Sequence, residues 1–85
     1  MQLQKIRKEI DQLDDQLLTL LNQRAEQVLH VAEIKKKEGS PIYVPQREKA
    51  LMQSLHVKNK GPLSADAVAH IYQTILQEMR LLQDG

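Results

Sequence analysis

The sequence predicts an all-α protein in which three helices, long, short and medium, form a single domain over residues 1–85. Helix-favouring residues with apolar side chains at helical spacing fill the chain, apart from two joints containing Gly and Pro at residues 39–45 and 59–64. Only 2% of the residues are aromatic, so Leu, Ile, Val and Ala must form the core. The chain has no cysteine, so neither disulfides nor thiolate-bound zinc can reinforce so small a domain. A partner chain is the reinforcement that remains.

The first predicted helix covers residues 3–37 and carries its apolar side chains on a heptad repeat. Two heptad positions hold them: Leu3, Ile10, Leu17 and Val31 in one, and Ile6, Leu13, Leu20 and Ile34 in the other. Such a helix is about 52 Å long at ~1.5 Å per residue, whereas a compact chain of this length is roughly 30 Å across. We therefore expect this apolar seam to extend beyond its own chain, and a second copy is the simplest partner to cover it.

The second and third predicted helices cover residues 45–57 and 64–83. Pro45 suits the first position of a helix, and Ser64 is a good N-cap with Asp66 matching the dipole of the first turn. The second helix is expected to turn three side chains inward, Leu51, Met52 and Leu55. The third is expected to carry an apolar stripe of Val68, Ile71, Tyr72, Ile75, Leu76, Met79 and Leu82.

The charge balance argues against nucleic acid and membrane partners. Twelve basic and eleven acidic residues give a net charge of +1, which produces no strong field. The single basic run, residues 35–37, lies in a predicted last turn, where the helix dipole favours cations. No apolar run approaches the roughly 18 residues that a membrane span needs, and no signal-peptide pattern opens the chain. We predict a cytoplasmic protein that binds neither nucleic acid nor a membrane.

Cations stand on the seam where the heptad pattern favours apolar side chains. Arg24 shares the heptad position of Leu17, and Arg7 and Lys35 border the same seam. Arg7 and Lys35 have an ordinary interpretation, because their stems can cover apolar surface while the charges reach water. An unpaired cation in the middle of the stripe is costly, and Asp14 lies about 15 Å from Arg24 along the axis, too far for a direct pair. We therefore expect an anionic partner for Arg24.

The spacing of these cations suits a small anion bound between two chains. Arg24 and Lys35 are about 16 Å apart along the axis, so their long side chains can converge on one ligand. Arg7 is about 25 Å from Arg24, which is too far within one chain. An antiparallel two-fold dimer can carry Arg7 of one copy to the middle of the other copy's helix.

Three polar residues outside the first helix are further candidates. Arg47 lies in the first turn of the second helix, where the dipole disfavours a cation, and this hints at another role. Glu48 suits that dipole as an ordinary surface residue. Gln83 lies on the edge of the apolar face of the third helix, where its ordinary interpretation is a frayed, solvated terminus.

An ordered set of motifs runs through the chain. The first helix has Arg7, Ile10-Asp11-x-Leu13-Asp14, Leu17-Leu18-x-Leu20-Leu21-x-x-Arg24 and Val28-x-x-Val31-Ala32-x-x-Lys35. The first joint and second helix have Pro41-Ile42-Tyr43-Val44-Pro45-Gln46-Arg47-Glu48, and the third has Ile71-Tyr72-x-x-Ile75-Leu76-Gln77-Glu78 followed by Gln83. Over essentially its whole length the chain resembles the all-α (AroQ) class of chorismate mutases.

The resemblance implies an intertwined all-helical homodimer with two equivalent, shared active sites. These would convert chorismate to prephenate, a Claisen rearrangement on the route to phenylalanine and tyrosine. It implies that Arg24 and Arg47 bind the substrate carboxylates from one chain, and that Arg7 of the other chain binds a carboxylate too. Lys35 and Gln83 would donate hydrogen bonds to the ether oxygen of the breaking bond. Because the reaction is unimolecular, it needs no metal or other cofactor.

The resemblance also implies that Glu48 accepts a hydrogen bond from the ring hydroxyl. Two positions depart from the commonest pattern of the family. Val44 stands where many members have an Asp that helps to bind the ring hydroxyl, and Met79 where some have a Ser near a carboxylate. We expect both changes to weaken substrate binding modestly.

Several alternatives stay open. An isochorismate pyruvate-lyase shares this fold and has similar cations, and a non-catalytic helical dimerisation module would leave Arg24 merely covering apolar surface. A metal site is disfavoured, because His30, His56 and His70 show no short-range ligand spacing. Similar domains occur fused to prephenate dehydratase, prephenate dehydrogenase or DAHP synthase modules, so the chain is either a whole enzyme or one domain of a larger protein.

Overall fold

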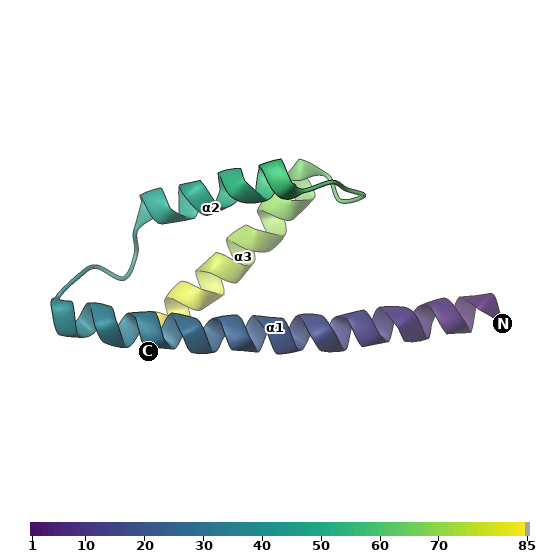
Figure 1. The fold of residues 1–85 in the computed structure, drawn as a ribbon, viewed down its shortest axis with the longest axis horizontal. Helices are drawn as coiled ribbons and strands as arrows, with labels where there is room; N and C mark the ends of the chain where they lie inside the picture. Colours follow the sequence, from purple (N-terminus) through teal and green to yellow (C-terminus); the bar gives the residue numbers. More distant parts are fainter. Residues whose placement is uncertain (85) are drawn as a thin grey trace.

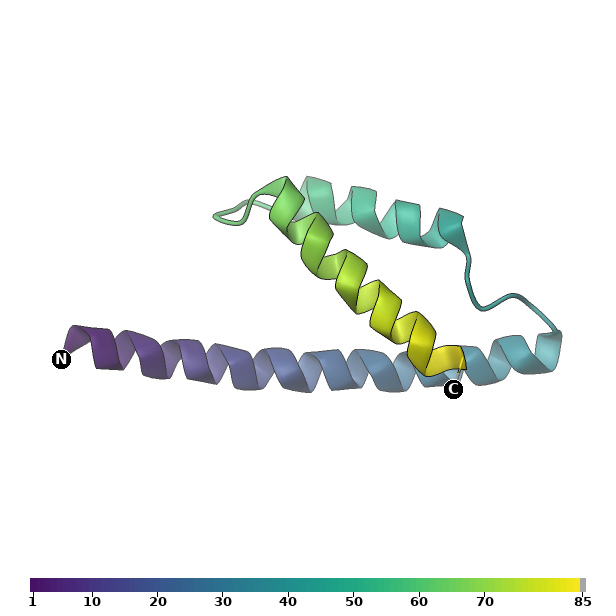
Figure 2. The ribbon, with the colours of Figure 1, turned by 180° about the vertical axis from the view of Figure 1, so that it is seen from behind.

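Three helices make up the described part of the chain, residues 1–84 of the computed structural model: α1 (Gln2–Glu38), α2 (Pro45–Lys58) and α3 (Ala65–Asp84). The all-α prediction is confirmed, and each predicted helix end lies within one residue of the observed one. Figures 1 and 2 show α1 as a long straight rod, with α3 crossing it obliquely near its C-terminal end and α2 returning above. None of these helices combines the length and apolarity that crossing a membrane requires.

The end of α1 is set by Gly39. Its φ of 72° is left-handed, a conformation that glycine adopts without the steric cost of a Cβ. There the Gly39 N–H donates to the carbonyl of Lys36 at 3.4 Å, and the Ser40 N–H donates to the carbonyl of Lys35 at 2.9 Å. This cap stops the helix and turns the chain toward α2.

The starts of α2 and α3 follow the capping signals in the sequence. Pro45 occupies the first turn of α2, preceded by an extended residue. Ser64 caps α3, since its Oγ accepts from the Ala67 N–H at 3.0 Å. Between these helices the Asn59 Oδ1 accepts from the Gly61 N–H at 3.0 Å and closes the turn.

The small core of the chain lies along α3. α3 packs against both α1 and α2, whereas α1 and α2 make no close backbone contact within the described residues. Leu76 and Met79 are the two buried residues among positions 1–84, each 8% exposed. The inward side chains predicted for α2 are half-buried, but Ile71 of the predicted α3 stripe remains 48% exposed. One chain therefore covers only part of the apolar surface that its helices present.

The seam of α1 is uncovered, as the sequence predicts. Its side chains in the N-terminal half are between 49% and 62% exposed: Leu3, Ile6, Ile10, Leu13, Leu17 and Leu20. The α1 residues that become half-buried instead lie in the C-terminal half, among them Leu21, Ala25 and Val28. The chain measures 56 × 24 × 16 Å, and its radius of gyration is 16.0 Å. A compact chain of this length has a radius of gyration of about 12 Å, so the protruding helix determines the shape.

Truncation of Leu76 tests this description of the core. We expect Leu76→Ala to lower the free energy of unfolding by about 2–4 kcal/mol, because it removes buried methyl groups where α3 packs. Urea denaturation followed by circular dichroism, at one fixed chain concentration, measures the change. Val57, 81% exposed, is the matched control, and Val57→Ala should cost less than about 0.5 kcal/mol. Equal losses for both variants would contradict the core described here.

Candidate active site

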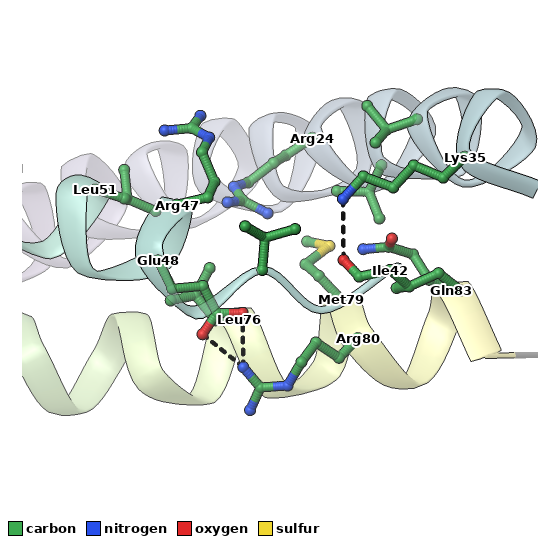
Figure 3. Close-up of a pocket in the computed structure, with 13 residues that line it drawn as sticks. Arg24, Lys35, Ile42, Arg47, Glu48, Leu51, Leu76, Met79, Arg80 and Gln83 are labelled. Carbon is green, nitrogen blue, oxygen red and sulfur yellow. Dashed lines mark hydrogen bonds and ion pairs between the residues drawn. The ribbon is translucent and has the colours of Figure 1, made fainter. Parts of the chain in front are cut away.

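A cavity of about 420 Å³ lies between α1, α3 and the segment that leads into α2. Its lining residues come from four parts of the chain: Arg24, Val28, Val31 and Lys35 from α1, Ile42 and Val44 from the loop, Arg47, Glu48 and Leu51 from α2, and Leu76, Met79, Arg80 and Gln83 from α3. Figure 3 shows how these side chains lie around it. Five of the six predicted site residues therefore line one cavity, although they are far apart in the sequence.

The α1 side of the cavity follows from helix periodicity. Arg24 and Lys35 are eleven residues apart, about three turns, so both side chains leave the same face of α1. Val28 and Val31 lie between them on that face. The sequence predicts that Arg24 and Lys35 can converge on one ligand, and the structure brings both to the same cavity.

Lys35 also ties the loop to α1. Its Nζ donates to the carbonyl oxygen of Ile42 at 3.0 Å (Figure 3). This contact holds the segment before α2 against the C-terminal part of α1. An ammonium group has three donors, so Lys35 keeps two that can meet a ligand.

The α2 side of the cavity begins at the first turn of that helix. Arg47 and Glu48 stand two and three residues after Pro45, and both charged side chains line the cavity. The Glu48 carboxylate accepts two hydrogen bonds from Nη1 of Arg80, at 2.6 and 2.7 Å. The pair of Glu48 and Arg80 is the sole ion pair among the residues that the structure describes.

Arg80 is a site residue that the sequence analysis missed. It is the one Arg or Lys in α3, and it follows the buried Met79 directly, which is the signal that could have pointed to it. Its Cζ lies 4.9 Å from the centroid of the Tyr43 ring, within the range of a cation–π contact. The hydrogen bond to Glu48 raises the pKa of Arg80 above its usual value.

Gln83 contributes the amide at the C-terminal end of α3. The ordinary interpretation of Gln83, a frayed and solvated helix terminus, is wrong. α3 continues to Asp84, and Gln83 is half-buried in the cavity wall. Its Oε1 is buried and has no hydrogen-bond partner within the described residues. A buried carbonyl oxygen that receives no hydrogen bond is costly, and its missing partner must be a donor.

Arg7 is the predicted site residue that one chain does not bring to the cavity. It is exposed in the second turn of α1 and does not line the pocket. Because α1 is unbroken from residue 2 to residue 38, Arg7 lies about 25 Å from Arg24 along the axis.

The charges around the cavity suit a small anion. Four cations and one carboxylate line it, against walls of Val, Ile, Leu and Met side chains. Next to apolar walls, charges interact more strongly with a ligand than they would in bulk water. No group of three His, Cys, Asp or Glu side chains in residues 1–84 is arranged to hold a metal ion.

Comparison with known proteins places the chain in a family. The family profile of chorismate mutase type II matches residues 6–84. The chain belongs to this family. The resemblance seen in the sequence is thereby confirmed, and the family's solved structures share the three-helix fold.

Individual relatives agree with this placement. Chorismate mutase from Thermus thermophilus superposes with a TM-score of 0.97 at 26% identity, over 99% of this chain and 96% of that one. Chorismate mutase from Helicobacter pylori, solved in complex with prephenate, gives a TM-score of 0.89 at 34% identity, over 96% and 89% of the two chains. A bifunctional chorismate mutase/prephenate dehydratase from Aquifex aeolicus is 39% identical over 79 residues, 88% of this chain and 22% of that protein. The chain spans about a fifth of the length of this and other curated relatives.

The half-buried charge of Arg24 yields a prediction about stability. No carboxylate pairs with Arg24 in residues 1–84, so folding desolvates its charge without compensation. We expect Arg24→Met to raise the free energy of unfolding by about 0.5–1 kcal/mol, since Met keeps the length of the stem without the charge. Urea denaturation without ligand measures it, and Lys36→Met, an exposed neighbour on α1, should change stability by less than about 0.5 kcal/mol. A destabilised Arg24→Met would show that the guanidinium has a partner in the folded protein.

Proposed function

We propose that this chain catalyses the rearrangement of chorismate to prephenate. The observation that carries the proposal is the convergence of Arg24, Lys35, Arg47 and Gln83, from three helices, on one cavity with apolar walls. Membership of the type II family and the prephenate complex of the Helicobacter pylori relative support the same reaction.

The two guanidinium groups would bind the two carboxylates of the substrate. Arg24 and Arg47 reach the cavity from different helices, and their planar donor pairs match carboxylates in a bidentate geometry. Holding both carboxylates restrains a flexible dianion in the compact conformer in which its reacting carbons meet. Such restraint is a large part of what this reaction needs, since the barrier includes the entropy of reaching that conformer.

Lys35 and Gln83 would stabilise the transition state at the ether oxygen. The rearrangement breaks one C–O bond and forms one C–C bond within the same molecule, with no proton transferred and no group lost. Negative charge grows on the ether oxygen as the C–O bond breaks, and fixed donors aimed at that atom lower the barrier. Lys35 has unused donors, and the Gln83 amide donates without titrating. Glu48 would accept from the ring hydroxyl.

We propose that the functional unit is an intertwined homodimer with two shared sites. The uncovered seam of α1, whose apolar side chains in the N-terminal half are between 49% and 62% exposed, supports a second copy as the partner. In an antiparallel arrangement the partner's α1 would bring its Arg7 to the open side of the cavity. Arg7 would then add a third guanidinium for a substrate carboxylate.

Residues 1–85 form, in this proposal, one chorismate mutase domain, and its location in the cytoplasm stays a prediction.

Val44 and Met79 both line the cavity and add apolar surface where the family pattern often has polar groups. The Val44 side chain cannot accept a hydrogen bond, so Glu48 would hold the ring hydroxyl alone or with help from the backbone. We expect modestly weaker binding with the donors to the ether oxygen unchanged.

Turnover of chorismate tests the proposed reaction. We expect the chain to form prephenate, and Lys35→Ala or Gln83→Ala to lower kcat by more than about tenfold, because each removes a donor to the ether oxygen. Circular dichroism should show unchanged helix content for both variants. Parallel incubation with isochorismate is the control, and salicylate without prephenate would identify an isochorismate pyruvate-lyase instead. No turnover of either compound would favour a non-catalytic dimerisation module.

Complementation between inactive variants tests whether the sites are shared. Arg7→Glu and Arg24→Ala should each be inactive alone. In a mixed dimer, one site combines both changes while the other combines wild-type Arg7 with wild-type Arg24. Statistical mixing makes half of the dimers mixed, each with one intact site of two, so activity should recover to about a quarter of wild type. Full activity of Arg7→Glu alone, or no recovery on mixing, would contradict a cross-chain site.

A further inference from the structure

The cavity contains one carboxylate among several cations, so this carboxylate can compete with those of a substrate for the same cations. Glu48 is the sole acidic residue that lines it, next in sequence to Arg47 and across from Arg24 and Lys35. These cations line the same cavity, so they would attract a Glu48 carboxylate that had no partner, and the apolar walls strengthen such an attraction. A Glu48 paired with one of them would neutralise a charge that a substrate carboxylate needs.

The structure shows Glu48 paired elsewhere. Both carboxylate oxygens accept from Arg80 Nη1, and no ion pair joins Glu48 to another cation within residues 1–84. Figure 3 shows the Glu48 carboxylate turned toward α3 and Arg80, while the Arg24 and Arg47 guanidinium groups lie nearer α1. The Glu48–Arg80 pair thus lies on the α3 side of the cavity, and the guanidinium groups of Arg24 and Arg47 lie on the α1 side.

Arg80 is itself held in place. Its guanidinium lies over the Tyr43 ring, with Cζ 4.9 Å from the centroid, and the side chain is 34% exposed against 23% for Glu48. The loop before α2 therefore supports Arg80 while α2 supplies its carboxylate partner. An Arg restrained by both a ring and a bidentate carboxylate loses less freedom on pairing than a free surface Lys would.

We infer that Arg80 is a positioning residue, which holds the Glu48 carboxylate on the α3 side of the cavity and so leaves Arg24, Lys35 and Arg47 unpaired for the carboxylates of the substrate. The inference rests on the proposed function. Arg80 acts on binding rather than on bond breaking, because substrate and transition state carry the same two carboxylates. It also keeps Glu48 at one place at the rim, where a ring hydroxyl can reach it.

Steady-state kinetics with chorismate test the inference. We expect Arg80→Met to raise KM by about fivefold to tenfold while kcat stays within about twofold, the signature of lost uniform binding. Arg80→Lys, which keeps the charge, should reverse at least half of the rise in log KM. Lys60→Met, an exposed cation in the α2–α3 loop, controls for the change in net charge and should leave both constants unchanged.

The Glu48→Gln background separates positioning from direct contact. With no carboxylate to hold away, the further change Arg80→Met should move KM by less than about twofold. An equal rise of KM in both backgrounds would mean that Arg80 acts on the substrate itself or on the fold, and would overturn the inference. An unchanged KM for Arg80→Met in the wild-type background would overturn it too. These outcomes require an active wild type, so a wild-type chain without chorismate turnover marks failure of the proposed function itself.

Discussion

The length of α1 is the constraint on which the rest of this structure depends. This helix has 37 residues, and α3, which packs against it, covers only its C-terminal half. α3 packs there, and the cavity forms where α1, α3 and the start of α2 meet. The N-terminal half keeps its apolar seam exposed and carries Arg7 away from the cavity. A chain that cannot complete its own core has, for the same reason, a site that is open on one side.

The same helix places the charged groups of the site. Residues eleven apart on α1 face the same way, so Arg24 and Lys35 flank two valines with no loop needed to position them. Covering that face with α2 and α3 partly desolvates the Arg24 charge, which no carboxylate offsets within the described chain. Among residues 1–84 two are buried, so this cost falls on a small core. Unpaired charges next to apolar walls weaken the fold while they preorganise an anion site.

The sequence predicts the local features well, because helix ends and helix faces depend on nearby residues. The heptad seam, the Ser64 cap and Pro45 gave helix bounds accurate to one residue. The prediction of Glu48 and Gln83 as site residues rested mainly on family resemblance, since each also has an ordinary interpretation as a surface residue or a solvated terminus. Arg80 escaped notice because its partner Glu48 lies 32 residues away, and the periodicity of one helix says nothing about pairing between two. Ile71 fits the α3 stripe, yet it remains exposed because the described chain alone does not cover that part of the helix.

The nearly balanced net charge and the cationic cavity are consistent with each other. A net charge of +1 provides no long-range field, and this is what argues against nucleic acid as a partner. Within the cavity, by contrast, four cations face one carboxylate, and that carboxylate is occupied by one of the four. Three positive side chains are therefore left for a ligand, next to apolar walls where salt screens charges less than it does in open solvent. The concave arrangement of these few side chains suits a small anion, whereas the net charge of +1 favours no long polyanion.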